Sequence, residues 1–429
     1  MRKLILMGLL ISITSFLFSQ PVNKIINAKK VKRIEKVLSA DDMQGRRAFT
    51  PGSEKAAAFI AEAFKKAGLQ MLPESSSYFQ QFTMTQPKLI SLSGTIDDIA
   101  ASEKNTTVIS SATTLKVTPQ SGFSNAAIKK GDNLIAKAKM LINKGENLIV
   151  AVDPGFSGNF SRLSTLKRNL FKSDKSVVFV LAENQPKEFN IELVQEVKES
   201  KLMNVVGMLP GKSKKDEYVI FSGHYDHLGI GKPNEKGDSI FNGANDDAAG
   251  TTAVIMLARY FAKHKNNERT ILFAAFTAEE VGGYGATYFS RQLDPAKVMA
   301  MFNIEMIGTE SKWGTNSAYI TGYDKSDMGE ILQKNLTGSK FTFHPDPYTS
   351  QNLFYRSDNA TLARLGVPAH TISTSKMDSE KYYHTQEDEM ETLDMKNMAE
   401  IIKAIALSST TIVNGEDTPT RVNIQSLDR

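Results

Sequence analysis

The chain has 429 residues, of which 41% are hydrophobic and 23% charged, and its formal net charge at pH 7 is +5. These ordinary globular values exclude a fibrous or disordered protein, and the length allows one large domain plus a smaller one. Basic residues are spread along the chain, and the short run Lys212, Lys214 and Lys215 indicates a solvated turn, so nucleic-acid binding is not expected.

Residues 1–19 have the pattern of a secretory signal peptide. Arg2 and Lys3 give a charged start, and an apolar run from Leu4 to Phe18 follows. About 15 apolar residues are few for a membrane span and typical of a signal, with cleavage near Ser19-Gln20. An uncleaved anchor is the alternative. We expect an exported protein, periplasmic or extracellular.

The chain contains no cysteine. This excludes disulfides, cysteine zinc ligands, a thiol nucleophile and a lipidated cysteine. An exported protein of this composition must be held together by its core and by any metal that it binds.

Helical periodicity marks Ile34 to Leu38 and Ser53 to Gly68, and Gly68 supplies a stop. Residues 20–90 are assigned to the first part of a main domain. Residues 91–203 differ, because apolar runs at 148–152 and 177–181 are separated by loops rich in Gly, Ser, Asn and Lys. They indicate an inserted small α/β or β-rich lobe without ligand residues of its own.

From Asn204 onward, apolar strands alternate with helices. The expected strands and helices lie at 218–222, 251–261, 270–276, 285–292, 298–304 and 362–372. This alternation indicates a mostly parallel sheet covered on both faces, which is an α/β fold of three layers, α/β/α. The domain is expected to end at residue 413, followed by a loose tail at 414–429.

Acidic and imidazole side chains recur at the ends of these apolar runs. They are His224-Tyr225-Asp226, Asn245-Asp246-Asp247, Glu279-Glu280, Asn303-Ile304-Glu305 and Tyr383-His384. Ligands of parallel sheets bind beyond the carboxyl ends of the strands, where His224, Glu279 and Glu305 fall, one strand apart. Histidines with carboxylates suit zinc, but the acids are too many for one tetrahedral site. Two metals about 3.5–4 Å apart that share one carboxylate would use them all and build a hydrolase.

The first two segments also have simpler interpretations. His224 and Asp226 fit a metal ligand with its carboxylate partner, but they also fit a surface turn. Asp246 and Asp247 precede a helix, where adjacent acids are most often caps. Small residues on both sides of the pair instead suggest a close approach to the backbone.

The later segments allow functional interpretations of the same kind. Glu279 and Glu280 follow an apolar strand, so one could bind metal while the other faces the reacting water, although an exposed acidic turn is the alternative. Glu305 ends a nearly apolar strand, where a buried charge must be paired or metal-bound. His384 supplies a second imidazole from a polar loop.

Seven motifs have a recognisable order. They are Gly45-Arg46-Arg47 with Thr50-Pro51-Gly52, Asn204 to Pro210, Gly223 to Gly229, Gly243 to Gly250, Phe276 to Gly283, Phe302 to Gly308, and Arg356-Ser-Asp358 with His384 to Asp388. Together they closely resemble the dizinc aminopeptidase family of bacterial leucyl aminopeptidases, whose relatives include glutamate carboxypeptidase II-like exopeptidases and glutaminyl cyclases. The resemblance covers about residues 41–68 and 204–393. It implies the three-layer zinc exopeptidase fold, and the lobe resembles the protease-associated insert of some relatives.

The resemblance implies two zinc ions per chain, with other divalent metals as alternatives. Asp246 would bridge them, and the bond that follows it would be cis. His224 and Glu305 would complete one metal, and Glu280 and His384 the other.

The resemblance also implies roles around the metals. Glu279 would be the general base and Asp226 the partner of His224. Tyr383 would help to hold the oxyanion, and Asp247 would be an orienting group. Glu305 departs from the family pattern, which has Asp there, so its extra methylene requires a backbone shift or altered denticity.

We therefore hypothesise a secreted metallo-aminopeptidase that acts on peptides or proteins with a free N-terminus, through a metal-bridging water and Glu279. A glutaminyl cyclase with a single zinc is the nearest alternative. A carboxypeptidase would need a cationic pocket, to which Arg356 could contribute, and a non-catalytic peptide-binding protein is a further alternative. The preferred N-terminal residue and the oligomeric state stay open.

Overall fold

The computed structural model describes residues 22–427, so the expected signal peptide lies outside the described residues. The chain divides into two compact units. One is formed by the residues up to Gln81 and from Leu202 onward, and the other by Phe82–Lys201. Within residues 22–427, no helix combines the length and the apolarity that a membrane span requires.

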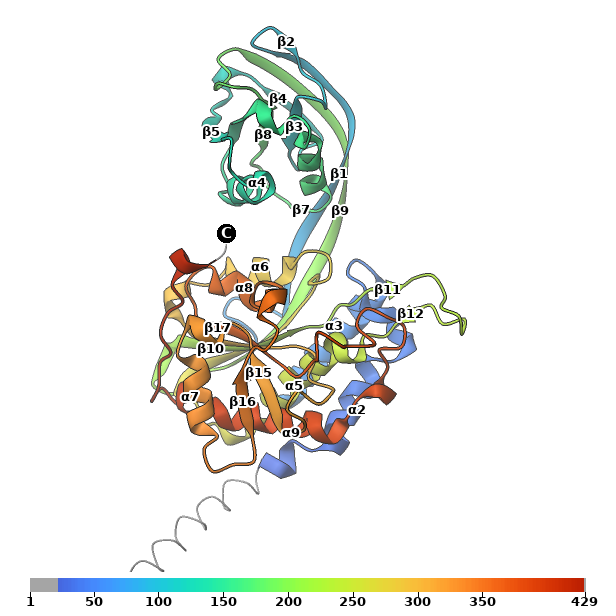
Figure 1. Ribbon diagram of the computed structural model, residues 1–429, viewed down its shortest axis with the longest axis vertical. Helices are drawn as coiled ribbons and strands as arrows, with labels where there is room; N and C mark the ends of the chain where they lie inside the picture. Colours follow the sequence, from blue (N-terminus) through green and yellow to red (C-terminus); the bar gives the residue numbers. More distant parts are fainter. Residues whose placement is uncertain (1–21, 428–429) are drawn as a thin grey trace, which may run out of the picture. The chain divides into compact units, whose positions relative to one another are not determined.

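The first unit is built on a mixed, mostly parallel sheet (Figure 1). Its strands in spatial order are β16 (Thr342–Pro345), β15 (Ser317–Ile320), β17 (Ala369–Ser373), β14 (Val298–Ile304), β10 (Lys214–His224), β13 (Arg269–Phe276) and β9 (Phe189–Leu209). The central strands β17, β14, β10 and β13 are parallel, whereas β9 pairs antiparallel to β13 and β15 antiparallel to β17. This confirms the predicted α/β class with a mostly parallel sheet.

Helices cover both faces of this sheet. One face packs against α2 (Ala28–Leu38), α3 (Pro51–Ala67), α5 (Ala249–His264), α7 (Met328–Asn335) and α9 (Met395–Ser408). The other face packs against α6 (Tyr284–Ser290) and α8 (Asn359–Ala363). Along β10, Val219 and Phe221 face the first core and Ile220 faces the second, as the two-residue period of a strand requires.

The second unit has its own sheet, in the order β3 (Thr106–Ile109), β8 (Val177–Leu181), β6 (Leu148–Val152) and β5 (Ser124–Ile128), beside α4 (Leu134–Asn143). The apolar runs singled out in the sequence are strands β6 and β8. The unit starts earlier than the predicted lobe because β1 (Phe79–Ile96) begins before it and continues into it. Its remaining strands are β2 (Ile99–Ala100), β4 (Thr114–Val117) and β7 (Leu170–Phe171).

The end of the described chain differs from the loose tail that we expected. Val422 and Leu427 are buried in the second core of the first unit. The Arg421 guanidinium donates to the main-chain oxygens of Val298 and Pro295. Two buried apolar side chains and an arginine anchor hold residues 414–427 in place, a role that the weak periodicity of this segment did not reveal.

Phe221 should be a strong determinant of stability. Its ring is fully buried and stacks on Phe261, Phe273 and Phe302, with centroids 5.3, 5.8 and 4.8 Å away. We predict that Phe221→Ala lowers the free energy of unfolding by about 3–5 kcal/mol, measured by urea denaturation. Leu365→Ala is the matched control, since Leu365 is 48% exposed, and it should change stability by less than about 1 kcal/mol. Equal losses would contradict this packing.

Candidate metal centre

Three neighbouring strands bring the predicted residues to one edge of the sheet. His224 is the last residue of β10, Glu305 directly follows β14, and Glu279 lies just beyond the end of β13. Because β14, β10 and β13 are adjacent and parallel, their carboxyl ends meet at the same edge. The sheet order therefore places these three residues one strand apart, as predicted.

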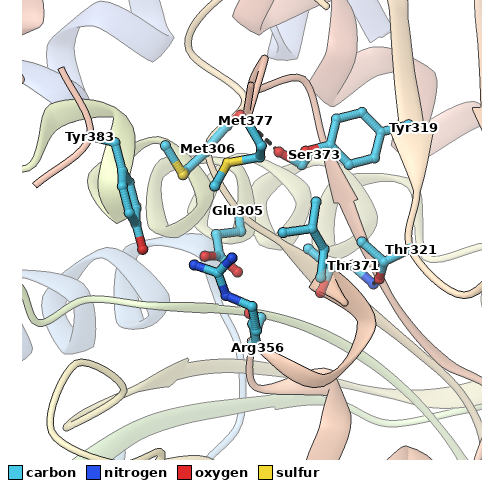
Figure 2. Close-up of a pocket in the computed structure, with 11 residues that line it drawn as sticks. Glu305, Met306, Tyr319, Thr321, Arg356, Thr371, Ser373, Met377 and Tyr383 are labelled. Atoms are coloured by element: carbon cyan, nitrogen blue, oxygen red, sulfur yellow. Dashed lines mark hydrogen bonds between the residues drawn. The ribbon is translucent and has the colours of Figure 1, made fainter. Parts of the chain in front are cut away.

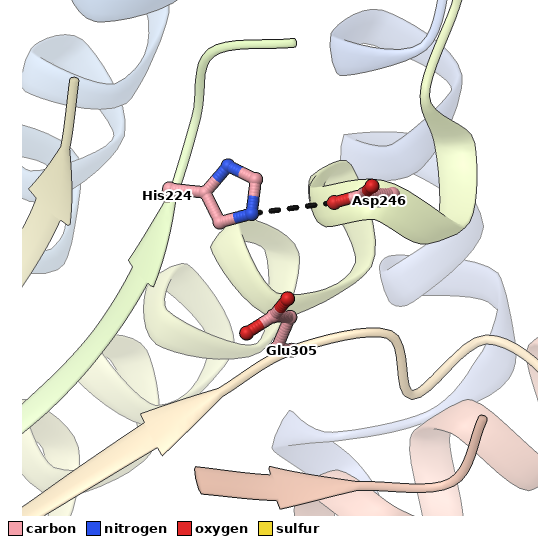
Figure 3. Close-up of side chains that lie close together, drawn as sticks. All are labelled: His224, Asp246 and Glu305. Atoms are coloured by element: carbon pink, nitrogen blue, oxygen red, sulfur yellow. Dashed lines mark ion pairs between the residues drawn. The ribbon is translucent and has the colours of Figure 1, made fainter. Parts of the chain in front are cut away.

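Asp246 lies between the two histidines. Its Oδ1 is 3.3 Å from His224 Nε2, and its Oδ2 is 3.1 Å from His384 Nε2 (Figure 3 for the first pair). Although burial raises it, the pKa of Asp246 lies well below its usual range because His224 and His384 pair with the carboxylate. The peptide bond to Asp247 is cis, as the resemblance implies.

Two groups of side chains therefore share Asp246. We call the first the His224 group, which contains His224, Asp246 and Glu305 within 4.8 Å. The second, the Glu280 group, contains Asp246, Glu280 and His227 within 4.8 Å, and His384 Nε2 lies 3.3 Å from Glu280 Oε1.

His227 stands inside the Gly223 to Gly229 motif, but its place there did not mark it as a ligand. As the second histidine of the His-Tyr-Asp-His run it carried no separate signal, because residues after a strand end do not follow a fixed side-chain direction. The fold turns its ring toward Glu280 and Asp246.

Zinc fits these groups. His224 Nε2, His227 Nδ1 and Glu280 Oε1 are buried without a hydrogen-bond partner among the described residues. Leaving such atoms without hydrogen bonds is unfavourable by about 1–3 kcal/mol each, and metal ions bound in the two groups would satisfy them. Imidazole nitrogens and carboxylate oxygens are the donors that zinc takes when thiolates are absent.

Burial also disfavours the ionised forms of carboxyl groups at the site. It raises the pKa of Glu305 to about 7 and that of Asp358 to about 8, in each case against the pull of His224. A divalent cation nearby favours the ionised form of such groups and offsets their desolvation. The charge of the site thus supports the same donor set.

Asp226 contacts the site differently from the expectation. His224 Nδ1 is 3.1 Å from the main-chain oxygen of Asp226, while the Asp226 carboxylate is 3.9 Å away. The carboxylate oxygen Oδ1 instead accepts the Glu279 N–H at 3.0 Å. Asp226 therefore holds His224 through its backbone and the glutamate loop through its side chain, and burial raises its pKa to about 6.

Glu279 has the environment of a group that exchanges protons. Burial raises the pKa of Glu279 well above its usual range. The nearby His224 lowers this pKa, whereas the negative charges of Asp358 and Glu305 raise it further. Its main chain is fixed by Asp226. A carboxylate whose pKa is raised toward the working pH is suited to accept a proton and return it.

Two further carboxylates organise the loops through main-chain N–H groups. Asp247 accepts from His224, Gly250 and Met306 at 3.2, 2.9 and 3.1 Å. Asp388 accepts from Asn245 and Asp246 at 2.8 and 3.0 Å. Asp247, which we expected to be an orienting group, makes contacts that suit that role, whereas Asp388 was marked in the sequence only by its place in a motif.

Small residues allow this close approach. A Cβ at Gly250 would lie 2.0 Å from the Ile304 oxygen and about as close to the Asp247 carboxylate, at 2.4 Å. Gly243 has φ of +54°, and a Cβ there would meet the His227 ring at 2.5 Å. The glycines that flank Asp246 and Asp247 are therefore required by space, as their pattern in the sequence suggested.

Arg46 ties the ligand loops to the rest of the unit. Its fully buried guanidinium donates to the main-chain oxygens of Leu38, Tyr225, Asn242 and Gly243 at 2.5–2.8 Å. Tyr225 follows His224, and Gly243 lies three residues before Asp246. One cation thus connects the end of α2 with the loops that carry the bridging and first imidazole ligands.

A small pocket that is open to solvent adjoins Glu305. Met306, Met377 and Tyr383 line one part of it, and Arg356 reaches it from the opposite direction (Figure 2). The Tyr383 ring stacks on His384, with centroids 3.9 Å apart. Tyr383 therefore lies between the Glu280 group and a cavity that could receive a ligand.

Comparisons with known proteins agree with this geometry. Residues 204–409 match the model of peptidase family M28. Aminopeptidase YwaD of Bacillus subtilis is 23% identical over 298 residues, which are 68% of this chain and 60% of that protein. A probable zinc metalloprotease of Pyrenophora teres f. teres is 38% identical over 109 residues, which are 25% of this chain and 23% of that protein. The chain thus spans less than two thirds of the length of these relatives.

Solved structures share the fold. An aminopeptidase from Aneurinibacillus sp. strain AM-1 has a TM-score of 0.53 at 18% identity, covering 95% of this chain and 98% of its own. A peptidase M28 precursor from Shewanella amazonensis SB2B has a TM-score of 0.53 at 15% identity, covering 96% and 99%.

Arg46 provides a test of the loop architecture. We predict that Arg46→Lys lowers the free energy of unfolding by at least about 1.5–3 kcal/mol, because an ammonium group has only three N–H donors for four buried oxygens. Arg47→Lys is the matched control, since Arg47 is adjacent and exposed. Urea denaturation of both variants measures the difference. An Arg46→Lys protein as stable as the wild type would contradict this role of Arg46.

Proposed function

We propose that the chain, whose residues 204–409 match the model of peptidase family M28, is a zinc-dependent aminopeptidase. It would remove the N-terminal residue of peptides or proteins whose amino terminus is free. The observation that carries the proposal is the placement of Asp246, whose two oxygens face two different histidines. A shared carboxylate of this kind is the central element of a two-metal hydrolase.

Two zinc ions would polarise the scissile carbonyl and activate water. His224 and Glu305 would hold one ion, Glu280 and His384 the other, and Asp246 both. Glu305 supplies a longer side chain than the Asp of the family pattern, yet its group lies within 4.8 Å, which supports its assignment as a ligand.

The remaining residues act on protons and on the substrate. The Glu279 carboxylate takes a proton from water as the tetrahedral centre forms and gives it to the leaving amine. The Tyr383 hydroxyl donates a hydrogen bond to the oxyanion, which is favoured by a half-buried position where few waters compete. Asp226 keeps the Glu279 main chain in place.

The alternatives place different demands on the chain. A cyclase that uses a single zinc has no need of the His224 group, whose members converge in this structure. A carboxypeptidase would require a cation for the free carboxylate, and Arg356 lies on the pocket wall. We also propose export, on the charged and apolar pattern of residues 1–19.

The general base can be tested separately from the metals. We predict that Glu279→Gln keeps its zinc content and fold but loses about 10²–10⁴-fold in kcat. Glu310→Gln, at an exposed glutamate of the same unit, is the control and should keep normal turnover. Metal analysis and steady-state kinetics are the measurements. Near-normal kcat for Glu279→Gln would show that another group is the base.

Substrate class can be tested with a panel of aminoacyl chromogenic amides. We predict hydrolysis that stops when a chelator removes metal and returns when zinc is restored at two ions per chain. Amides whose amino group is acetylated serve as the matched control and should resist hydrolysis. If zinc-loaded protein cleaves no member of the panel, the aminopeptidase assignment fails and the carboxypeptidase and cyclase assays become decisive.

A further inference from the structure

We propose that His227 is a direct metal ligand, through Nδ1, in the Glu280 group. The inference rests on the proposed function and deepens it, because it assigns a ligand that the family resemblance does not include. The metal of the Glu280 group would then be held by two imidazoles, from His227 and His384, and two carboxylates, from Asp246 and Glu280. The metal of the His224 group would keep one imidazole.

Both imidazoles lie close to the same two carboxylate oxygens. His227 Nδ1 lies 2.8 Å from Glu280 Oε1 and 3.9 Å from Asp246 Oδ2. His384 Nε2 lies 3.3 and 3.1 Å from the same two oxygens. Zinc bonds of 2.0–2.2 Å at tetrahedral angles separate neighbouring donors by about 3.3–3.5 Å. The four distances scatter around that value, so both imidazoles surround the same pair of oxygens.

The His227 ring is buried, and its nitrogens make no hydrogen bonds within the described chain that would compete with a metal. Its side chain is 0% exposed, and neither ring nitrogen has a hydrogen-bond partner among the described residues. The polar atom 2.8 Å from Nδ1 is Glu280 Oε1, which is itself a candidate metal ligand. A buried imidazole left in this state is unfavourable, and a cation at the centre of the group would satisfy Nδ1.

The main chain keeps the ring in this place. The His227 N–H donates to the Arg46 oxygen at 3.4 Å, and Gly243 leaves room for the ring where a Cβ would collide with it. The rings of His227 and His384 meet edge to face, with centroids 5.7 Å apart. The main-chain hydrogen bond and the room left by Gly243 therefore keep the His227 ring turned toward Glu280.

A consequence is that the two metals differ in how tightly they are bound. The Glu280 group would supply four protein donors, whereas the His224 group offers three, and more protein donors favour tighter binding. We expect stepwise metal release, with the ion of the His224 group leaving first. The competing arrangement is a hydrogen bond from Nδ1–H to Glu280, in which His227 would only position that ligand.

The first measurement is zinc affinity. Apoprotein is titrated with zinc against a chromophoric chelator for the wild type, His227→Ala, His384→Ala and the control His264→Ala, which removes a histidine at the end of α5. We predict that His227→Ala and His384→Ala each weaken one of two zinc sites by more than about 100-fold, the upper range for losing an outer partner. His264→Ala should bind both ions normally. Two unchanged sites in a folded His227→Ala protein would overturn the inference.

The second measurement separates ligation from positioning. Long-range ¹H–¹⁵N spectra of histidine-labelled protein report which ring nitrogen carries a proton and which binds metal. We predict that in zinc-loaded protein His227 binds through Nδ1 and is protonated at Nε2. A protonated Nδ1 in that state would overturn direct ligation. If the wild type bound fewer than two ions, the proposed function itself would fail, which is a different outcome from two ions without His227.

Discussion

Asp246 is the side chain on which the site depends, because its two oxygens face separate groups of donors while the residue itself is almost fully buried. A buried carboxylate is stable only when it is paired or bound to metal. Here the pairing comes from imidazoles on two distant segments, and Asp388 fixes the Asp246 main chain through its N–H. The position of one carboxylate thus couples the end of β10 to the loop that carries His384.

The charged residues around Asp246 bind main-chain groups of the ligand loops rather than side chains. Asp247 gathers N–H groups from His224 and Met306, and Arg46 gathers main-chain oxygens beside the loops of His224 and Asp246. An anion that binds donors and a cation that binds acceptors together enclose the centre. Such charge-assisted hydrogen bonds are stronger than neutral ones, so they can keep ligand loops in place while the ligands themselves repel one another.

Much of this could be predicted from the sequence, for physical reasons. Strands such as β14 are continuous apolar runs, and their polar end residues had to gather where parallel strands end. Other features depend on directions that no spacing encodes. His227 is one residue beyond Asp226, and only the folded loop shows that its ring turns into the Glu280 group. The Asp226 carboxylate accepts the Glu279 N–H and lies 3.9 Å from His224 Nδ1, and Arg46 makes contacts across nearly 200 residues of sequence, which local patterns do not reveal.

The central claim is that Asp246 bridges two metal ions. Anomalous diffraction at the zinc edge from zinc-loaded crystals tests it most directly, because it locates each ion without reference to activity. The account predicts two peaks about 3.5–4 Å apart, one beside Asp246 Oδ1 near His224 and the other beside Oδ2 near His384. A single peak at saturating zinc, or two peaks of which one does not contact Asp246, would contradict it.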